Sequence, residues 1–405
     1  MKGPLEGVRI LEWATWHQGA SGAGIMLGDL GAQVIKIEEP GIGDTLRGVR
    51  ELFGAGGLLP GGKNIFFEAS NRNKQSITLN LREERGRQVL YRLVEQCDVF
   101  TTNFRPGVCQ RLKLDYPTLK QYNPRLIYVG TSGYGSQGPY RDQRAYDWIG
   151  LAHSGMMTVM GERGMPPLTI VGMVIDQMGA MVAAYATLAA LAARDRWGVG
   201  QEVHTSMLGS AIWLQYINVT ACLLRGRSMR RSQRSSTTNP LANYYRCADG
   251  KWLMVCHPQS DRFWHPFCQA LGLESLEADP RFATTDARRE NREELIRLLD
   301  QAFASRPRRE WLEVLERHDL IFSPVNEIED LPQDPQVLAN GFFADFDHPT
   351  LGPIKVVAPP LEMSATPATV RSPAPELGQH TEQVLLELGG YTWDDIARLK
   401  EEGII

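Results

Sequence analysis

The sequence predicts an α/β protein with a doubly wound, Rossmann-like large domain and a smaller α+β domain. Three observations predict this class. Short apolar runs alternate with helix-like segments along the first half of the chain, polar Gly-containing turns follow those runs, and a hairpin pattern with several helices comes later. The chain has 405 residues, 43% of them hydrophobic, which is enough to bury large cores in two domains.

The N-terminal elements start a parallel sheet. They are a buried strand, a loop that opens into a Gly-rich helix, and a second strand, at residues 7–13, 17–32 and 33–39. This order is typical of sheets that bind dinucleotides. The glycines argue against that ligand, because Gly19, Gly22 and Gly24 read G-x-x-G-x-G whereas the dinucleotide fingerprint is G-x-G-x-x-G.

Three further strands continue the sheet, and each runs into a polar loop. They are predicted at residues 76–81, 98–103 and 125–130, with helices at 83–96 and from Asp115 between them. Residues 41–62 form a long Gly-rich loop, and loops of this length in a compact domain are usually functional. Because the carboxyl ends of parallel strands share one edge, ligand binding is expected at that edge.

The later part of the chain predicts a change of architecture. The expected divisions are a large α/β domain, a small α+β domain and an extended segment that returns to the first domain, at residues 1–224, 225–325 and 326–405. The small domain is expected to contain a hairpin with its turn at Asp249-Gly250 and helices at residues 261–271, 291–304 and 308–318. Asn291 and Glu294 have capping-box spacing. Residues 349–375 predict an extended crossing segment, and a last helix near 381–388 closes the chain.

Composition limits the classes of partner. The net charge of −4 and the isoelectric point near 6.1 give no basic field for nucleic acid. The six cysteines form no C-x-x-C pair and lack the histidine spacing of a zinc site, so no metal is expected. The N-terminus has no apolar signal region, and the Ala-rich run that begins at Gly179 is too short to span a membrane. A cytoplasmic protein without a membrane partner is expected.

One carboxylate, Asp176, stands between an apolar lead-in and a run of helix formers at residues 179–193. Gly172 allows a turn just before it, so Asp176 should lie at or just before the start of a helix. Two interpretations follow. The aspartate caps the helix by accepting free backbone N–H groups, or it is a carboxylate held beside apolar surface as a nucleophile.

Ordered sequence tags along nearly the whole chain resemble one family. The tags include GVRILEWATWHQGASGAG at the start, NRNKQSITLNL, NFRPG, GYG, AYD and SGMM in the middle, and WGVGQEVHTSM, DPRFAT and LGQHTEQVLLELG later. They are similar to those of the class III CoA-transferases, which include formyl-CoA transferase and carnitine CoA-transferase and have α-methylacyl-CoA racemase as a relative. The resemblance implies an interlocked homodimer.

For this chain, the resemblance implies that Asp176 is the catalytic aspartate. It would attack the thioester of an acyl-CoA to give an aspartyl anhydride, and the released CoA thiolate would then form an aspartyl-CoA thioester. An acceptor carboxylate would then attack the aspartyl-CoA thioester, and the two steps would run in reverse to give the acyl-CoA of the acceptor. Asp176 is expected to be ionised already at neutral pH, so that no general base is needed. CoA and acyl-CoA enter as substrates, and no tightly bound cofactor is expected.

The resemblance also implies contacts with CoA. Gln18 would orient the reacting carbonyl and act with Asp176 in catalysis. The implied CoA-binding residues are His17, Gln18, Gly19, Leu79, Arg82, Asn103, Phe104, Arg111, Gly133 and Tyr134. Arg82 and Arg111 suit phosphate through charge-assisted hydrogen bonds. Glu39 departs from the family, whose members often have an arginine there that stacks on adenine.

Two other functions stay open at this stage. A racemase or epimerase of 2-methylacyl-CoA needs a second base, and this chain has Tyr146 where the racemase has a histidine. The second open function is that of a non-catalytic acyl-CoA-binding subunit of a heteromeric transferase. The acids exchanged are not determined. Nearby aromatic and methionine residues favour an apolar acyl pocket, and Arg47 or Arg144 would suit a second carboxylate, as in an aromatic dicarboxylic acid such as benzylsuccinate.

Overall fold

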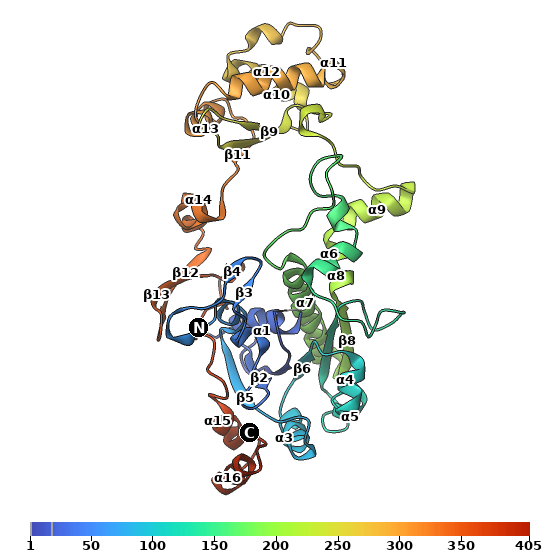
Figure 1. The fold of residues 1–405 in the computed structure, drawn as a ribbon, viewed down its shortest axis with the longest axis vertical. Coiled ribbons are helices and arrows are strands. Elements are labelled where there is room, and N and C mark those ends of the chain that lie inside the picture. The colour runs from blue at the N-terminus through green and yellow to red at the C-terminus, as the bar shows by residue number, and fades with distance from the viewer. Residues whose placement is uncertain (1, 18) are drawn as a thin grey trace. The chain divides into compact units, whose positions relative to one another are not determined.

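The computed structural model describes residues 2–17 and 19–405, and its main feature is a six-stranded parallel sheet (Figure 1). The strands lie in the order β5-β2-β1-β6-β7-β8, and all neighbours are parallel. Their bounds are β1 Arg9–Trp13, β2 Gln33–Glu38, β5 Lys74–Thr78, β6 Val99–Thr102, β7 Ile127–Ser132 and β8 Gln201–Ser206. The predicted mixed α/β class with a parallel sheet is confirmed.

The sheet has an apolar core on each face, because alternate residues of a strand point to opposite sides. Leu11 and Ile35 face a core with α3 (Glu84–Glu95), α15 (Thr381–Glu387) and α16 (Trp393–Glu401). Ile10 and Val34 face a second core, which contains α1 (Ala20–Asp29) and α7 (Val174–Trp197). These two helices also pack against each other.

The strand order reverses at β1, which lies between β2 and β6. The chain proceeds from β1 outward to β2 and β5, and then returns to β6 on the other side of β1. Ligands of open parallel sheets bind at the carboxyl ends of the strands beside such a reversal. This topology therefore places the loops after Trp13 and Thr102 at the expected ligand edge.

Shorter helices and strands lie in the connections between the strands of the sheet and in the segment after β8. They are β3 Glu51–Leu52, β4 Ala55–Gly56, α2 Ile65–Asn71, α4 Pro106–Arg111, α5 Tyr116–Leu119, α6 Asp147–His153, α8 Met207–Leu214 and α9 Tyr216–Arg225. The loop predicted at residues 41–62 contains the small β3–β4 hairpin. A hairpin that the sequence analysis missed lies at the start of the predicted extended segment. It pairs β12 Phe343–His348 with β13 Gly352–Val357. The expectation that the chain closes near residue 388 was wrong, because α16 follows.

Helix α7 is longer than the Ala-rich run suggested. It has 24 residues and is the one described helix that is long and apolar enough to cross a membrane. Half of its most apolar stretch is buried inside the protein, and it packs on α1, β7 and β8. The prediction that this run is too short for a span was therefore wrong in length, while its packing is that of a core helix.

Contact clustering divides the chain into two compact units. The first contains residues 1–158, 169–228 and 340–405, and the second contains 159–168 and 229–339. The second unit has the three-stranded sheet β11-β10-β9 and its own apolar core. Its elements are β9 Ala242–Arg246, β10 Trp252–Cys256, α10 Ser260–Leu271, α11 Thr285–Glu290, α12 Arg292–Phe303, α13 Arg308–Arg317, β11 Phe322–Pro324 and α14 Pro335–Ala339.

Two local predictions in the second unit had different outcomes. The hairpin turn at Asp249-Gly250 is present, and Gly250 has a φ of 78°. The capping box at Asn291 and Glu294 is wrong. The Asn291 side chain instead donates to the carbonyls of Arg281 and Ala287, while Glu294 pairs with Arg281. A tertiary partner thus displaced the local motif.

Candidate active site

A pocket with a volume of about 440 Å³ lies at the carboxyl edge of the sheet, where β1, β2, β5 and β6 end. Four residues that the sequence analysis assigned to CoA binding line it: Leu79, Arg82, Phe104 and Arg111. Trp13, the last residue of β1, stacks on Phe104 with ring centroids 4.1 Å apart and lines the pocket beside it. The edge beside the strand reversal is therefore hollow and aromatic on one side.

The cations of this pocket lie at its rim. Arg82 is exposed and forms an ion pair of 3.3 Å with Glu39, which also lines the pocket. Exposed pairs of this kind contribute little to stability, at most about 1 kcal/mol. Arg82 can therefore exchange this carboxylate for an anionic ligand at small cost. Glu39 has a local partner and does not replace the stacking arginine of the family.

The β1–α1 loop, residues 14–19, passes from the end of β1 to α1, and Asn103 from the end of β6 holds it. The Asn103 amide donates to the Thr15 carbonyl at 2.6 Å and accepts from the Thr15 N–H at 3.2 Å. Asn103 therefore fixes the loop in addition to any contact with a ligand. Gln18, assigned to orient the reacting carbonyl, lies outside the described residues.

His17 is buried in this loop and its Nδ1 lies 2.9 Å from the Ser70 hydroxyl. Burial lowers the pKa of His17 to about 4, against an opposite contribution from the side chain of Gln177. The imidazole is therefore neutral at neutral pH. It provides a polar group beside the residue that follows Asp176, without adding a positive charge.

Gly19 is the N-cap residue of α1 and has a φ of 53° and a ψ of −92°, a conformation that other residues rarely adopt. A Cβ at this position would lie 2.7 Å from the Thr131 hydroxyl oxygen. Gly22, in the next turn, faces Ala180 of α7, where a Cβ would lie 2.6 Å from the alanine Cβ. The glycines of the G-x-x-G-x-G run thus allow close packing at the start of α1 and against α7.

Replacing Gly19 with alanine is expected to lower the free energy of unfolding by about 2 kcal/mol or more and to reduce activity, because both the left-handed backbone and the contact with Thr131 oppose a Cβ. Gly7→Ala is the matched control. Gly7 has a φ of 87° and no neighbour near its Cβ position, so a loss of only about 1 kcal/mol is expected. Chemical denaturation measures both. Equal losses in the two variants would contradict the role of the Thr131 contact.

Asp176 lies in the first turn of α7 and is 8% exposed. It is not the helix cap. The N-cap position is Met173, which has a φ of 53° and provides no side-chain cap. Asp147, the first residue of α6, supplies the acceptor instead. Its Oδ1 accepts from the N–H of Ile175 at 2.7 Å and from the N–H of Asp176 at 3.0 Å. The capping interpretation of Asp176 was therefore wrong, and its own carboxylate is not used in this way.

The charge state of Asp176 also differs from the prediction. Burial, followed by the negative charge of Asp147, raises the pKa of the Asp176 carboxyl to about 7. Its Oδ1 is buried without a hydrogen-bond partner among the described residues. Near pH 7 the free enzyme therefore contains both the protonated and the ionised form of this carboxyl, whereas the sequence predicted that Asp176 is already ionised. Burial raises the pKa of Asp147 too, but the two N–H groups that it accepts oppose this effect.

The loop after β1 and the start of α7 lie against each other. A Cβ on Gly179 would lie 4.0 Å from the Cα of Gly19. Because Asp176 is one turn before Gly179 and His17 lies beside Gln177, the structure brings Asp176, His17 and Gly19 to one place. The 440 Å³ pocket continues from the same loop through Ala14 and Thr15.

Gly133 and Tyr134 lie after β7 and do not line that pocket. The Gly133 carbonyl accepts from the N–H of Leu208, and a Cβ on Gly133 would lie 2.4 Å from that of Ala145. Tyr134 packs on Tyr140 and His153, with ring centroids 5.5 and 5.2 Å apart. His17, Gly19 and Asn103 do not line the 440 Å³ pocket either, so of the described residues assigned to CoA only Leu79, Arg82, Phe104 and Arg111 do.

Sequence reasoning missed the roles of Asp147 and Asp44. Asp147 stands in the AYD tag, but nothing in its spacing links it to Ile175 and Asp176. Asp44 follows β2 in the long loop and binds the β1–α1 loop. Over the described part of the chain, no group of three or more His, Cys, Asp or Glu side chains could hold a metal ion.

Comparisons with known proteins agree on one family. The family model for CoA-transferase family III matches residues 5–381. An acyl-CoA transferase of Fusarium pseudograminearum is 36% identical over 100% of this chain and 89% of its own length. The succinyl-CoA:glutarate CoA-transferase of Mus musculus is 33% identical over 99% of this chain and 90% of its own length.

Similarity in structure extends over the same length. The crystal structure of a CAIB/BAIF family protein from Brucella suis has a TM-score of 0.84 and 29% identity, covering 96% of this chain and all of that one. The Mycobacterium tuberculosis protein Rv3272 has a TM-score of 0.80 and 30% identity, covering 94% of this chain and 99% of that one. The chain belongs to CoA-transferase family III and is an enzyme that transfers CoA between an acyl-CoA and a carboxylic acid.

Proposed function

We propose that Asp176 is the nucleophile of this transferase. Its carboxylate attacks the thioester carbon of the donor, the C–S bond breaks, and an aspartyl anhydride and CoA thiolate result. The thiolate then attacks the aspartyl carbonyl and releases the donor acid, which leaves an aspartyl-CoA thioester. An acceptor carboxylate runs these two steps in reverse. The observation that supports this most is a buried carboxylate with no capping role beside the β1–α1 loop.

Burial of Asp176 suits these intermediates in two ways. Anhydrides and thioesters hydrolyse, so a site that excludes water protects them. A carboxylate taken out of water is also poorly solvated, which makes it a better nucleophile once it is ionised. The cost is that part of the free enzyme is protonated near pH 7, as the raised pKa of Asp176 indicates.

The 440 Å³ pocket is proposed to hold the nucleotide end of CoA. Leu79 and Phe104 would offer apolar surface to the adenine of CoA, and Arg82 and Arg111 would bind the CoA phosphates. Gln18 would orient the thioester carbonyl and His17 and Gly19 would flank it. Gly133 and Tyr134 remain proposed contacts for another part of the substrate.

The acyl group is proposed to lie beside aromatic side chains. Trp16 contacts Tyr146 edge-on, with ring centroids 5.8 Å apart, and Tyr146 directly precedes Asp147. Arg47 is a poor candidate for a second carboxylate, because it already forms two hydrogen bonds of 2.8 Å with Glu38. Arg144, which is exposed two residues before Tyr146, is the better one.

We also propose an interlocked homodimer. The division into a doubly wound large domain at residues 1–224 and further parts at 225–325 and 326–405 is a proposal as well. Exposed apolar side chains on α7, α8 and α9 support association. They include Met181, Tyr185, Trp197, Trp213, Tyr216, Ile217, Leu223 and Leu224. Light scattering that reported a monomer at working concentrations would overturn the dimer.

Trapping with hydroxylamine tests the covalent mechanism. The enzyme is incubated with acyl-CoA and then with hydroxylamine, which converts an activated carboxyl to a hydroxamate that peptide mass spectrometry locates. Modification of Asp176 that depends on acyl-CoA is expected, and Asp147 should stay unmodified as an internal control. Turnover without modification of Asp176 would contradict the covalent mechanism. Deuterium uptake from solvent at the α-carbon without an acceptor acid would indicate the racemase instead.

A further inference from the structure

The β1–α1 loop has a strained backbone next to the reacting groups. Trp16 has a φ of 62°, in the left-handed region that large side chains avoid, and it directly precedes His17. Such a residue costs about 1–3 kcal/mol and persists only where its surroundings impose it. The groups that bind the Trp16 backbone therefore show what imposes this conformation.

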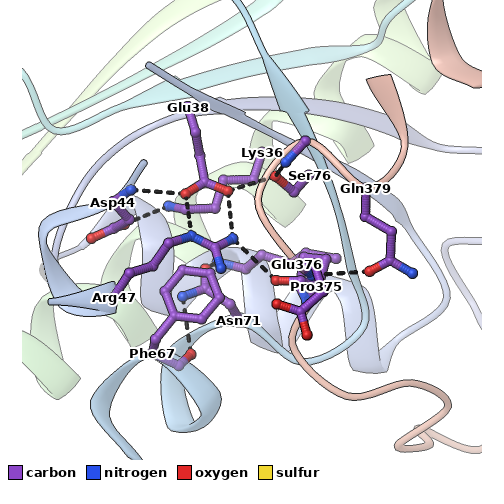
Figure 2. Close-up of polar contacts among 12 residues, drawn as sticks. Lys36, Glu38, Asp44, Arg47, Phe67, Asn71, Ser76, Pro375, Glu376 and Gln379 are labelled. Atoms are coloured by element: carbon purple, nitrogen blue, oxygen red, sulfur yellow. Dashed lines mark hydrogen bonds and ion pairs between the residues drawn. The ribbon is translucent and has the colours of Figure 1, made fainter. Parts of the chain in front are cut away.

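Asp44 is the side chain that holds the Trp16 backbone. Its Oδ1 accepts from the N–H of Trp16 at 3.2 Å, from the Thr15 hydroxyl at 3.1 Å and from the N–H of Leu46 at 2.9 Å. Its Oδ2 lies 2.7 Å from the ammonium nitrogen of Lys36 on β2 (Figure 2). One carboxylate thus joins the loop after β1 to the turn after β2.

Lys36 completes this arrangement beneath the loop. Its ammonium group donates to the Ala14 carbonyl at 2.9 Å and to Glu12 at 3.2 Å, and its side chain is fully buried. Burial lowers the pKa of Lys36, but the charges of Asp44 and Glu12 outweigh this effect and raise it above its usual range. The pKa of Asp44 is lowered, because Lys36 and two N–H groups outweigh its burial. Both partners are charged at neutral pH.

A second contact fixes Asp44 from its other side. The N–H of Asp44 donates to Glu38 Oε2 at 2.8 Å, and Glu38 also binds Arg47 and the Ser76 hydroxyl (Figure 2). Arg47 in turn covers the ring of Phe67 at 3.7 Å. Asp44 is therefore held by both backbone and side chain, and its position is rigidly determined.

A buried ion pair of this kind is weak support for stability, because the cost of removing both charges from water cancels much of their attraction. Well-packed apolar residues would serve the core as well. What apolar residues cannot supply is an acceptor for the Trp16 N–H and the Thr15 hydroxyl. The pair is therefore better explained by the conformation that it imposes on the loop.

We propose that Asp44, oriented by Lys36, is a positioning residue that keeps Trp16 in its left-handed conformation and so sets His17 and Gly19 for acyl transfer. This inference rests on the proposed function of the β1–α1 loop and Asp176. It assigns to the start of the long 41–62 loop a role in the chemical step.

The test compares three variants in the full-length enzyme. In Asp44→Asn, the Lys36 ammonium repels an amide NH₂ at the Oδ2 position and attracts the amide oxygen. The amide therefore turns over, and its NH₂ replaces the acceptor that Trp16 uses. Asp44→Asn with Lys36→Met removes the opposed cation and lets the amide oxygen accept from Trp16 again. Asp29→Asn is the matched control, since Asp29 is also buried and ion-paired, with Arg72 at 2.6 Å, but lies at the far end of α1.

Asp44→Asn is expected to reduce kcat at least about tenfold, since misplacement of a reacting group affects the chemical step most. KM for acyl-CoA is measured in parallel, because Asp44 also lines the 440 Å³ pocket. The double variant should recover a substantial part of kcat. Hydrogen exchange of the Trp16 amide should become faster in Asp44→Asn and stay slow in Asp29→Asn. Melting temperatures show how much each variant loses in stability alone.

Three outcomes would overturn the inference. They are unchanged protection of the Trp16 amide in Asp44→Asn, a loss of kcat that Asp29→Asn shares at equal loss of stability, and no recovery in the double variant. Failure of the proposed function is a separate result, because hydroxylamine would then leave Asp176 unmodified in the wild-type enzyme. The exchange of the Trp16 amide does not depend on that outcome.

Discussion

Asp176→Asn is expected to lower kcat by about a thousandfold or more, the scale on which enzymes lose activity with their nucleophile. The amide has nearly the same size, and the helix start should survive because Asp147 binds the backbone of Asp176 and does not need its side chain. Binding of CoA should be preserved. Initial rates of CoA exchange and calorimetric titration with CoA measure the two effects.

Asp195→Asn is the matched control for this variant. Asp195 is exposed in the last turn of the same helix, so the same chemical change there should leave kcat and the melting temperature unchanged. An Asp176→Asn enzyme with a rate near that of the wild type would exclude Asp176 as the nucleophile. Loss of CoA binding together with activity would indicate a structural role instead.

Asp147→Asn is expected to move the acidic limb of kcat/KM to lower pH by about one unit, at the small end of shifts caused by a neighbouring charge. In the wild type, kcat/KM should rise with pH through about 7, because only the ionised Asp176 attacks and its pKa is about 7. The amide oxygen of asparagine still accepts both N–H groups. It no longer repels the charge on Asp176, so the pKa of Asp176 falls.

Asp147→Ala separates capping from charge. It removes the acceptor for the N–H groups of Ile175 and Asp176 and should cost about 1–2 kcal/mol of stability, as loss of a helix cap does. Full pH profiles and denaturation of both variants provide the measurement. His17 does not account for the limb, since its pKa is near 4. An acidic limb that stays in place or moves to higher pH in Asp147→Asn would refute the charge effect.

Much of the large unit follows from local patterns. Runs such as residues 7–13 and 33–39 contain apolar residues that are buried on both faces of their strands, so these two strands could be located directly. Strand β8 was missed for the opposite reason. It lies at the edge of the sheet, its outward positions Glu202 and His204 are polar and partly exposed, and its sequence lacks an apolar run.

The sequence by itself determined the α/β class, the first strands of the parallel sheet and the family, because these depend on residues close together in the chain or on ordered tags. It also pointed to Asp176, whose catalytic role stays a proposal. The tertiary structure alone decided what surrounds that carboxylate. Asp147 lies 29 positions from the Asp176 N–H, and Asp44 lies 28 positions from that of Trp16. A pKa depends on burial and on charges brought close by folding. The cap of a helix depends on which acceptor the fold places beside its free N–H groups. Neither is encoded in a local pattern.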